Sequence, residues 1–213
     1  MNKSELIEKS FKIISEITKD NFVTIRNFEY IPDESSIEND IDVMIPSKYI
    51  KDVSQRLESM GYSVGSDNLQ YLYGAEPHIH FMYHDKSGYG IHFDVVTGLY
   101  YRSSNDLNLF IKINTELIDS MMNNKVKVDG MWKWQPSPED ELVHLCCHAI
   151  FDKRLVKDAY AERIDYLFKL CEEEQLRWLL EKAFFKVSDT IFESIKNNKT
   201  VEIYKNYVSF MDY

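Results

Sequence analysis

Two aspartates separated by one residue, Asp40 and Asp42, flank the start of an apolar run that contains Ile41, Val43 and Ile45. In a β-strand, residues two apart share a face, so both carboxylates would point to one side and the apolar side chains to the other. Two adjacent carboxylates on a half-buried face repel each other unless a cation lies between them. The pattern therefore predicts a half-buried strand that carries a site for a divalent metal ion.

A third aspartate, Asp94, stands in a second segment that alternates in the same way. Its neighbours Ile91, Phe93 and Val95 would share one face of a strand, and Asp94 would lie on the other face with His92. If the two strands are neighbours, three carboxylates converge on one face of a sheet. Such a cluster suits Mg²⁺, which takes a few carboxylates together with water and phosphate oxygens. The alternative interpretation is that all three are ordinary solvated acids.

The length and charge of the chain restrict its class. Its 213 residues are enough for one large domain or two small ones, and 44% hydrophobic with 28% charged residues is typical of a globular protein. The net charge of −10 argues against a general nucleic-acid binder, because affinity for the phosphate backbone depends on clustered lysines and arginines. A small anionic substrate held by a local basic pocket is compatible with this charge.

The sequence also indicates a compartment. No segment approaches the roughly 18–20 consecutive apolar residues of a membrane span, and the N-terminus lacks the apolar core and cleavage site of a signal peptide. The three cysteines (Cys146, Cys147 and Cys171) show no metal-binding spacing and are typical of reduced core residues. We therefore expect a cytoplasmic protein without a membrane partner.

Helical and strand patterns alternate in the first part of the chain. One amphipathic helix is expected to begin with Ser4 as its cap, and another to begin with Ser47 and close at Gly61. Turn residues are expected to separate the later strands. Beside the two acidic strands, strands are expected near residues 22–25, 69–73 and 77–84, with turns at 65–68 and 85–88. These elements predict an α/β or α+β fold, a mixed sheet with flanking helices.

The pattern becomes helical from Ser137 almost to the end of the chain. Ser137 can cap the first helix, Pro138 suits its first turn, and the three acids that follow favour a helix N-terminus. Further helices are expected over residues 157–171, 173–185, 188–197 and 199–210. We therefore predict two domains, a mixed α/β domain over residues 1–136 and a helical domain over residues 137–213.

The order of these features resembles a known family. Arg26 after a short strand, the acidic strand with Asp40 and Asp42, a helix and then Asp94 are similar to the polymerase-β-type nucleotidyltransferase fold. More specifically, the chain resembles small bacterial nucleotidyltransferase-like proteins, and residues 138–148 are similar to the helix that opens their second domain. The resemblance implies that Asp40 and Asp42 hold two Mg²⁺ ions with the nucleotide phosphates. Asp94 would complete the second metal site and help to deprotonate the acceptor hydroxyl.

The implied activity is Mg²⁺-dependent transfer of a nucleoside monophosphate from an NTP to a small-molecule acceptor, which the helical domain would bind. Related enzymes grip the triphosphate with a Gly-Ser pair upstream of the acids, where this chain has Arg26 and Asn27, with Ser35 and Ser36 nearer the acids. Arg26, Ser36 and Lys153 are therefore our candidates for binding the nucleotide. Two alternatives stay open: a non-catalytic nucleotide-binding or regulatory module, and a toxin-like nucleotidyltransferase that modifies a macromolecule.

Four histidines lie on two of the predicted strands. His78, His80 and His84 alternate along one predicted strand and would share a face, and His92 lies on a neighbouring strand. They form either a half-solvated sheet face or the border of the carboxylate site. His92 is the favoured border residue because it shares a face with Asp94.

A second polar group lies on a predicted helix of the C-terminal part. His144 and His148 are four residues apart and precede Asp152, a spacing that can hold zinc. Because Leu145 replaces the glutamate of a zinc-protease motif, a hydrogen-bonded helix is favoured over zinc, with substrate contact as a further alternative. Three basic residues follow, either as a solvated helix end or as a clamp for the triphosphate, and Lys153 is the best candidate among them.

Overall fold

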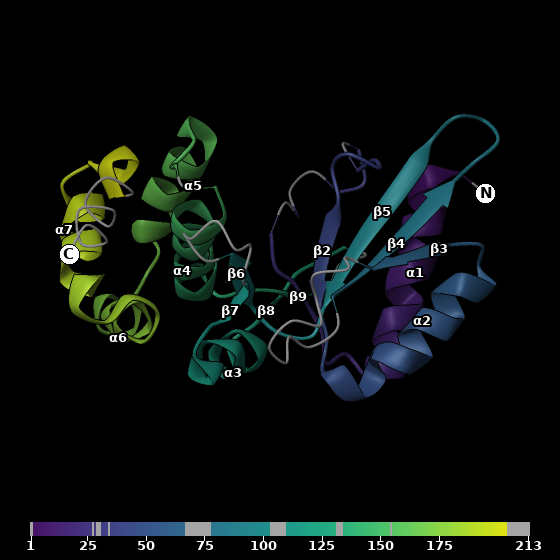
Figure 1. Ribbon diagram of the computed structural model, residues 1–213, viewed down its shortest axis with the longest axis horizontal. Helices are drawn as coiled ribbons and strands as arrows, with labels where there is room; N and C mark the ends of the chain where they lie inside the picture. The colour runs from purple at the N-terminus through teal and green to yellow at the C-terminus, as the bar shows by residue number, and fades with distance from the viewer. Residues whose placement is uncertain are drawn as a thin grey trace. The chain divides into compact units, whose positions relative to one another are not determined.

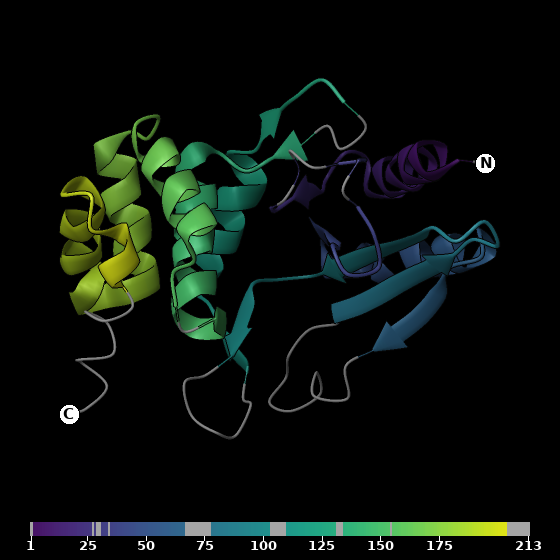
Figure 2. The same cartoon turned by 90° about the horizontal axis from the view of Figure 1, so that it is seen from above.

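The structure is a computed structural model that describes residues 2–26, 28, 31–33, 35–66, 78–102, 110–130, 134–153 and 155–203. The chain forms two compact units, Met1–Leu99 with Lys125–Pro136, and Tyr100–Asn124 with Ser137–Tyr213. The first unit contains a mixed sheet and the second is mainly helical (Figure 1; Figure 2), so the predicted α/β fold class is confirmed. Residues 100–124 belong to the helical unit, whereas the predicted boundary groups them with the sheet. The division into a catalytic and a substrate-binding domain stays a prediction.

The first unit is built on a five-stranded sheet with the strand order β1-β2-β5-β4-β3. Strands β2 and β5 are parallel neighbours, and every other neighbouring pair in this sheet is antiparallel. In chain order the strands are β1 (Val23–Thr24), β2 (Ile41–Met44), β3 (Ser63–Ser66), β4 (His78–His84) and β5 (Gly90–Val96). A short hairpin of β8 (Val126–Lys127) and β9 (Trp134–Gln135) completes the unit.

The strand β3 corrects one expectation. The turn predicted over residues 65–68 is wrong at its start, because Gly65 pairs with His80 and Ser66 pairs with Ile79. Glycine and serine are common in turns, but pairing with a long neighbouring strand outweighs that local preference. The strand predicted near residues 69–73 lies outside the described residues.

The core of the first unit lies between one face of the sheet and two helices, α1 (Lys3–Thr18) and α2 (Ile50–Ser59) (Figure 1). Ile41 and Val43 of β2 are buried in this core, and Phe93 of β5 makes an edge-to-face contact with Phe11 of α1 at 5.3 Å between ring centroids. The apolar side of both acidic strands is therefore confirmed as the core side. By the period of two, the aspartates of these strands are placed on the opposite face.

Two predicted helix caps are wrong. The cap of α1 is Asn2, whose side chain accepts a hydrogen bond from the Glu5 amide while the Glu5 carboxylate accepts one from the Asn2 amide. Ser47 opens a 3-10 turn, η2 (Ser47–Tyr49), and caps neither that turn nor α2 with its side chain. Asn2 and Ser4 are both good cap residues, and only the reciprocal bond with Glu5 decides between them.

Gly90 stands where the loop before Asp40 packs against the start of β5. A Cβ atom on Gly90 would lie 2.3 Å from Cγ1 of Ile37, so the loop approaches the strand as closely as a glycine allows. We expect Gly90→Ala to lower the free energy of unfolding by about 1–3 kcal/mol, the usual cost of overpacking, in a chemical denaturation curve. Adding Ile37→Ala should recover most of that loss, and a Gly90→Ala variant as stable as wild type would contradict this packing.

The helical unit begins with a hairpin and is organised around one buried helix (Figure 2, green and yellow). Helix α4 packs against α3, α5 and α6, and all its residues from Asp140 to Cys147 are buried. The predicted cap is confirmed, since Ser137 accepts from the Asp140 amide and Pro138 opens the first turn. The elements are β6 (Tyr100–Arg102), β7 (Phe110–Lys112), α3 (Thr115–Asn123), α4 (Pro138–Cys147), the π-helix η3 (His148–Lys153), α5 (Asp158–Phe168), α6 (Glu173–Phe184), η4 (Phe185–Val187), α7 (Ser188–Lys196) and η5 (Thr200–Glu202).

Two further observations bear on the predictions. The helix predicted over residues 199–210 begins as the 3-10 turn η5, and residues 204–210 lie outside the described part of the chain. Among the described residues, no helix is long and apolar enough to cross a membrane.

Asp140 provides a pH-dependent test of the helical unit. Burial raises the pKa of its carboxyl to about 6, although the Ser137 hydroxyl donates a hydrogen bond to it. The folded protein therefore binds this proton more readily than the unfolded chain, whose aspartate has the usual pKa of 3.8, and stability falls as pH rises between these values. The difference corresponds to about 3 kcal/mol. Asp140→Asn should remove this decline in denaturation curves between pH 4 and pH 7, and parallel curves for the two proteins would contradict the assignment.

Candidate metal centre

Three carboxylates meet on the first unit's sheet. Strands β2 and β5 are parallel neighbours in which Asp42 and Asp94 are direct partners, and Asp40 comes immediately before β2, two residues from Asp42. One carboxylate oxygen from each aspartate lies within 4.8 Å of the other two. Because the apolar residues of both strands face the core, the pleat itself brings the acids together. The structure thus unites the three aspartates that the sequence singles out.

The three acids lie in a partly desolvated setting. Asp42 is 3% exposed and Asp94 is 7% exposed, while Asp40 is half-buried. Burial raises the pKa of the Asp42 carboxyl to about 7, and the negative charges of Asp40 and Asp94 act in the same direction. A cation at the cluster would offset this cost, and three hard carboxylate oxygens are the ligands that Mg²⁺ prefers. The residues present therefore fit a divalent metal ion.

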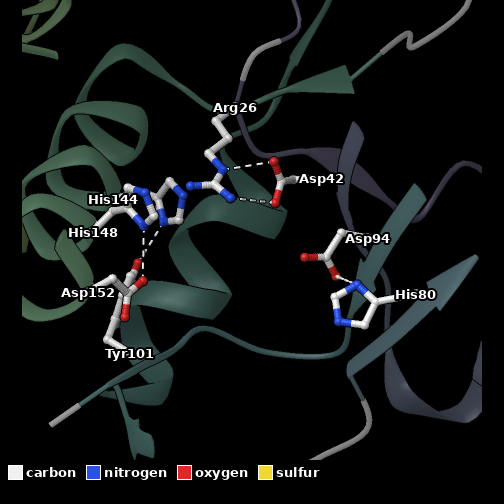
Figure 3. Close-up of polar contacts among 8 residues, drawn as sticks. All are labelled: Arg26, Asp42, His80, Asp94, Tyr101, His144, His148 and Asp152. Carbon is white, nitrogen blue, oxygen red and sulfur yellow. Dashed lines mark hydrogen bonds and ion pairs between the residues drawn. The ribbon is translucent and has the colours of Figure 1, made fainter. Parts of the chain in front are cut away.

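Arg26 forms an ion pair with Asp42. Its Nε donates to Oδ2 of Asp42 at 2.7 Å and its Nη2 donates to Oδ1 at 2.9 Å (Figure 3). The position follows from the sheet, because the Ile25 amide donates to the Asp42 carbonyl at the end of β1. The Arg26 charge lowers the pKa of Asp42, but burial has the larger effect. Sequence reasoning selected Arg26 for phosphate binding and did not foresee this ion pair.

The predicted nucleotide-binding residue Ser36 lies in a tight turn just before Asp40. Its hydroxyl oxygen accepts hydrogen bonds from the amides of Glu38 and Asn39, and its own amide donates to the Asn39 carbonyl. This turn sets the direction in which the chain enters β2. Ser36 therefore shapes the approach to the acids, and its predicted contact with a nucleotide stays a prediction.

One of the sheet histidines, His80, borders the acid cluster, and His92, the border residue that the sequence favoured, contacts His80. Nδ1 of His80 lies 3.9 Å from Oδ1 of Asp94 and 2.9 Å from Nε2 of His92 (Figure 3 shows His80 beside Asp94). Nδ1 of His92 lies 3.3 Å from the carbonyl oxygen of Ile37. A carbonyl can only accept, so in the neutral pair His92 donates to Ile37 and accepts from His80. His84 is exposed, and the side chain of His78 lies outside the described residues.

The polar group of the helical unit forms its own hydrogen bonds. Nδ1 of His144 lies 2.6 Å from the Tyr101 hydroxyl, and Nδ1 of His148 lies 2.9 Å from Oδ2 of Asp152 (Figure 3). These contacts agree with the favoured interpretation of a hydrogen-bonded helix. Tyr101 had no signal in the sequence, because its contact crosses 43 residues. Lys153 is exposed at the end of η3, and its role in phosphate binding stays a prediction.

The helical unit also has a shallow, open surface hollow of about 610 Å³ between α3 and α6. Its lining includes Asp119 and Asn123 of α3 and Gln175 and Trp178 of α6. This volume falls in the range of small-molecule pockets, and the indole ring offers a flat apolar surface beside polar groups. The hollow therefore has the volume of a small-molecule site, although it is open to solvent.

Comparison with known proteins places this site in a family. A search of the curated proteins found no match. A family model described as "uncharacterised nucleotidyltransferase" matches residues 36–185, which include Asp40, Asp42 and Asp94 but not Arg26. The match covers more than half of the chain and spans parts of both compact units. The chain therefore belongs to this family of uncharacterised nucleotidyltransferases.

Proposed function

We propose that this protein is a Mg²⁺-dependent nucleotidyltransferase that transfers a nucleoside monophosphate from an NTP to a hydroxyl or phosphate group of a small-molecule acceptor. The observation that carries the proposal is the convergence of Asp40, Asp42 and Asp94 on one sheet face, within 4.8 Å of one another. Family membership supports the reaction class. The convergent acids support the metal ion, because Asp40 and Asp94 still raise the pKa of Asp42 beside Arg26, and a divalent cation would offset this repulsion.

Each aspartate has a role in this proposal. Asp40 and Asp42 would hold the metal ions, and Asp94 would complete the second metal position. Mg²⁺ held there would supply positive charge at the reacting phosphate and at the acceptor oxygen. The acceptor oxygen attacks the α-phosphorus, the bond between that phosphorus and the oxygen bridging to the β-phosphate breaks, and pyrophosphate leaves. Asp94 accepts the proton of an acceptor hydroxyl.

The binding of both substrates is assigned to further residues. Arg26, Ser36 and Lys153 bind the triphosphate, with Arg26 the best suited because a guanidinium pairs with two phosphate oxygens at once. The helical unit binds the acceptor, and its open hollow of about 610 Å³ is compatible with an acceptor of small-molecule size. The free thiols of Cys146, Cys147 and Cys171 support a cytoplasmic location.

Release of pyrophosphate from an NTP provides the direct test. Purified protein is incubated with Mg²⁺, each of the four common NTPs and a panel of hydroxylated and phosphorylated small molecules, and pyrophosphate and the nucleotidylated product are measured. We expect release that requires Mg²⁺ and an acceptor, and that disappears in Asp42→Asn. Absence of release with every NTP, together with absence of NTP binding in calorimetry, would refute the proposal.

The ion pair between Arg26 and Asp42 favours a second candidate, a non-catalytic nucleotide-binding or regulatory module. The guanidinium occupies both oxygens of Asp42, as a permanent replacement for the metal would. Such a module would bind an NTP whose affinity does not depend on Mg²⁺, and it would release no pyrophosphate. Calorimetric titration of the NTP with and without Mg²⁺ therefore separates the two candidates.

A further inference from the structure

The contact between Arg26 and Asp42 involves the carboxylate that is central to the metal centre. Asp42 is the partner of Asp94 in the parallel register, and it is two residues from Asp40. Both of its oxygens accept a guanidinium N–H, at 2.7 and 2.9 Å. The side chains are 17% and 4% exposed, so water screens this pair only weakly. Asp42 therefore has a well-aligned cationic partner within its own chain.

A divalent cation bound to the cluster would use the same carboxylate. Each oxygen of Asp42 keeps a further lone pair, but a metal ion bound there would lie close to the guanidinium charge in a poorly screened setting. Arginine stays charged at any pH at which a protein is folded, so this repulsion cannot be relieved by loss of a proton. The repulsion between the metal ion and the guanidinium is relieved when the Arg26 side chain moves away from Asp42.

We propose that Arg26 is a resident cation of the acidic cluster that competes with the divalent metal ion for Asp42 and turns to the nucleotide phosphates when metal and nucleotide bind together. The first half of this proposal concerns the metal alone. The second half rests on the proposed nucleotidyl-transfer function. The planar guanidinium exchanges one bidentate anionic partner, a carboxylate, for another, a phosphate, so the charge of Arg26 is compensated in both states.

The exchange has a consequence for binding. Metal alone must break the two hydrogen bonds between Arg26 and Asp42 with no phosphate to replace them, and it therefore binds weakly. Metal accompanied by a nucleoside triphosphate brings the new anionic partner with it, and each ligand then increases the affinity for the other by the same factor. The wild-type protein should bind Mn²⁺ much more tightly with a non-hydrolysable NTP than without one.

Arg26→Met tests the competition because it removes the charge and keeps an unbranched side chain. Mn²⁺ serves as the probe, since it prefers the same oxygen ligands as Mg²⁺ and its free concentration is measured by electron paramagnetic resonance. Without nucleotide, we expect the variant to bind Mn²⁺ roughly tenfold more tightly than wild type. Its melting temperature should be lower than wild type without metal, and its rise on adding Mn²⁺ should be larger. An unchanged or weaker Mn²⁺ affinity in the folded variant would overturn the proposal.

The chain offers a matched control in the helical unit. Arg163 donates from Nε and Nη2 to the two oxygens of buried Glu141 at 2.7 and 2.8 Å, the same geometry away from the acidic cluster. Arg163→Met should lower the melting temperature without changing the Mn²⁺ affinity. If Arg26→Met does not fold, Arg26→Lys serves as the second variant. It replaces the bidentate guanidinium by a single ammonium group, and we expect its Mn²⁺ affinity to exceed that of wild type. Affinity at or below wild type in that variant would also overturn the competition.

The outcomes separate this proposal from the proposed function. Tighter Mn²⁺ binding in Arg26→Met, with no NTP binding by either protein, would uphold the competition and refute the exchange onto phosphate together with the nucleotidyl-transfer function. Turnover by a wild type whose Mn²⁺ affinity is unaffected by Arg26→Met would uphold the function and refute the competition. If neither protein binds Mn²⁺ at millimolar concentration, the acidic cluster is not a metal site and the competition is overturned.

Discussion

Replacing Asp42 by asparagine should nearly abolish pyrophosphate release and weaken the binding of metal-bound nucleotide by roughly tenfold or more. Asp42 is the register partner of Asp94, it is two residues from Asp40, and it is buried. An amide cannot supply the negative charge that attracts the metal ion, so the loss should occur in binding as well as in turnover. Calorimetry with a non-hydrolysable NTP and Mg²⁺ measures the first effect, and the pyrophosphate assay measures the second.

The control for this variant must account for Arg26, because Asp42→Asn also removes the carboxylate that pairs with it. The guanidinium then lies beside the cluster without that ion pair and could itself repel the metal. In the double variant Arg26→Met/Asp42→Asn this repulsion is absent, and we still expect weak binding because the carboxylate ligand is missing. Asp52→Asn, an exposed aspartate of α2, makes the same chemical change elsewhere in the unit and should be without effect. Recovery of metal binding in the double variant would show that Asp42 is not a ligand.

The acid cluster could be predicted from the sequence because it depends on short-range rules. The period of two places Asp40 and Asp42 on one strand face, and burial of Ile41 and Val43 decides which face is free. The partnership of Asp42 with Asp94 required one assumption, that the two acidic strands are neighbours. The structure makes β2 and β5 parallel neighbours in register, so this assumption is confirmed.

The features that sequence reasoning missed depend on contacts between distant residues. The guanidinium of Arg26 reaches Asp42 because β1 pairs with β2, and no local pattern around Arg26 indicates which anion it will meet. The contact between Tyr101 and His144 and the placement of residues 100–124 in the helical unit are of the same kind. Packing and pairing decide such features, and a single sequence contains no spacing that reports them.

Asp94→Asn should separate chemistry from binding. If Asp94 orients the acceptor hydroxyl and accepts its proton, its charge matters mainly in the transition state, whereas Asp40 and Asp42 hold the metal-bound nucleotide. The variant should lower kcat by about 10²-fold or more, the scale of a positioned base, and leave nucleotide affinity nearly unchanged. Steady-state kinetics and calorimetry on the same preparation provide the two values.

Asp94→Asn should also be more stable than wild type, although it is less active. Asp94 and Asp42 are 7% and 3% exposed, and the Asp94 charge contributes to the raised pKa of Asp42. Removing one negative charge from this crowded cluster relieves repulsion, so without metal we expect Asp94→Asn to melt about 2–4 °C above wild type, equivalent to about 1 kcal/mol. Added Mg²⁺ should stabilise wild type more than the variant and narrow the difference. Equal losses of nucleotide affinity in Asp42→Asn and Asp94→Asn would refute the division of labour, and full activity in Asp94→Asn would remove that residue from the site.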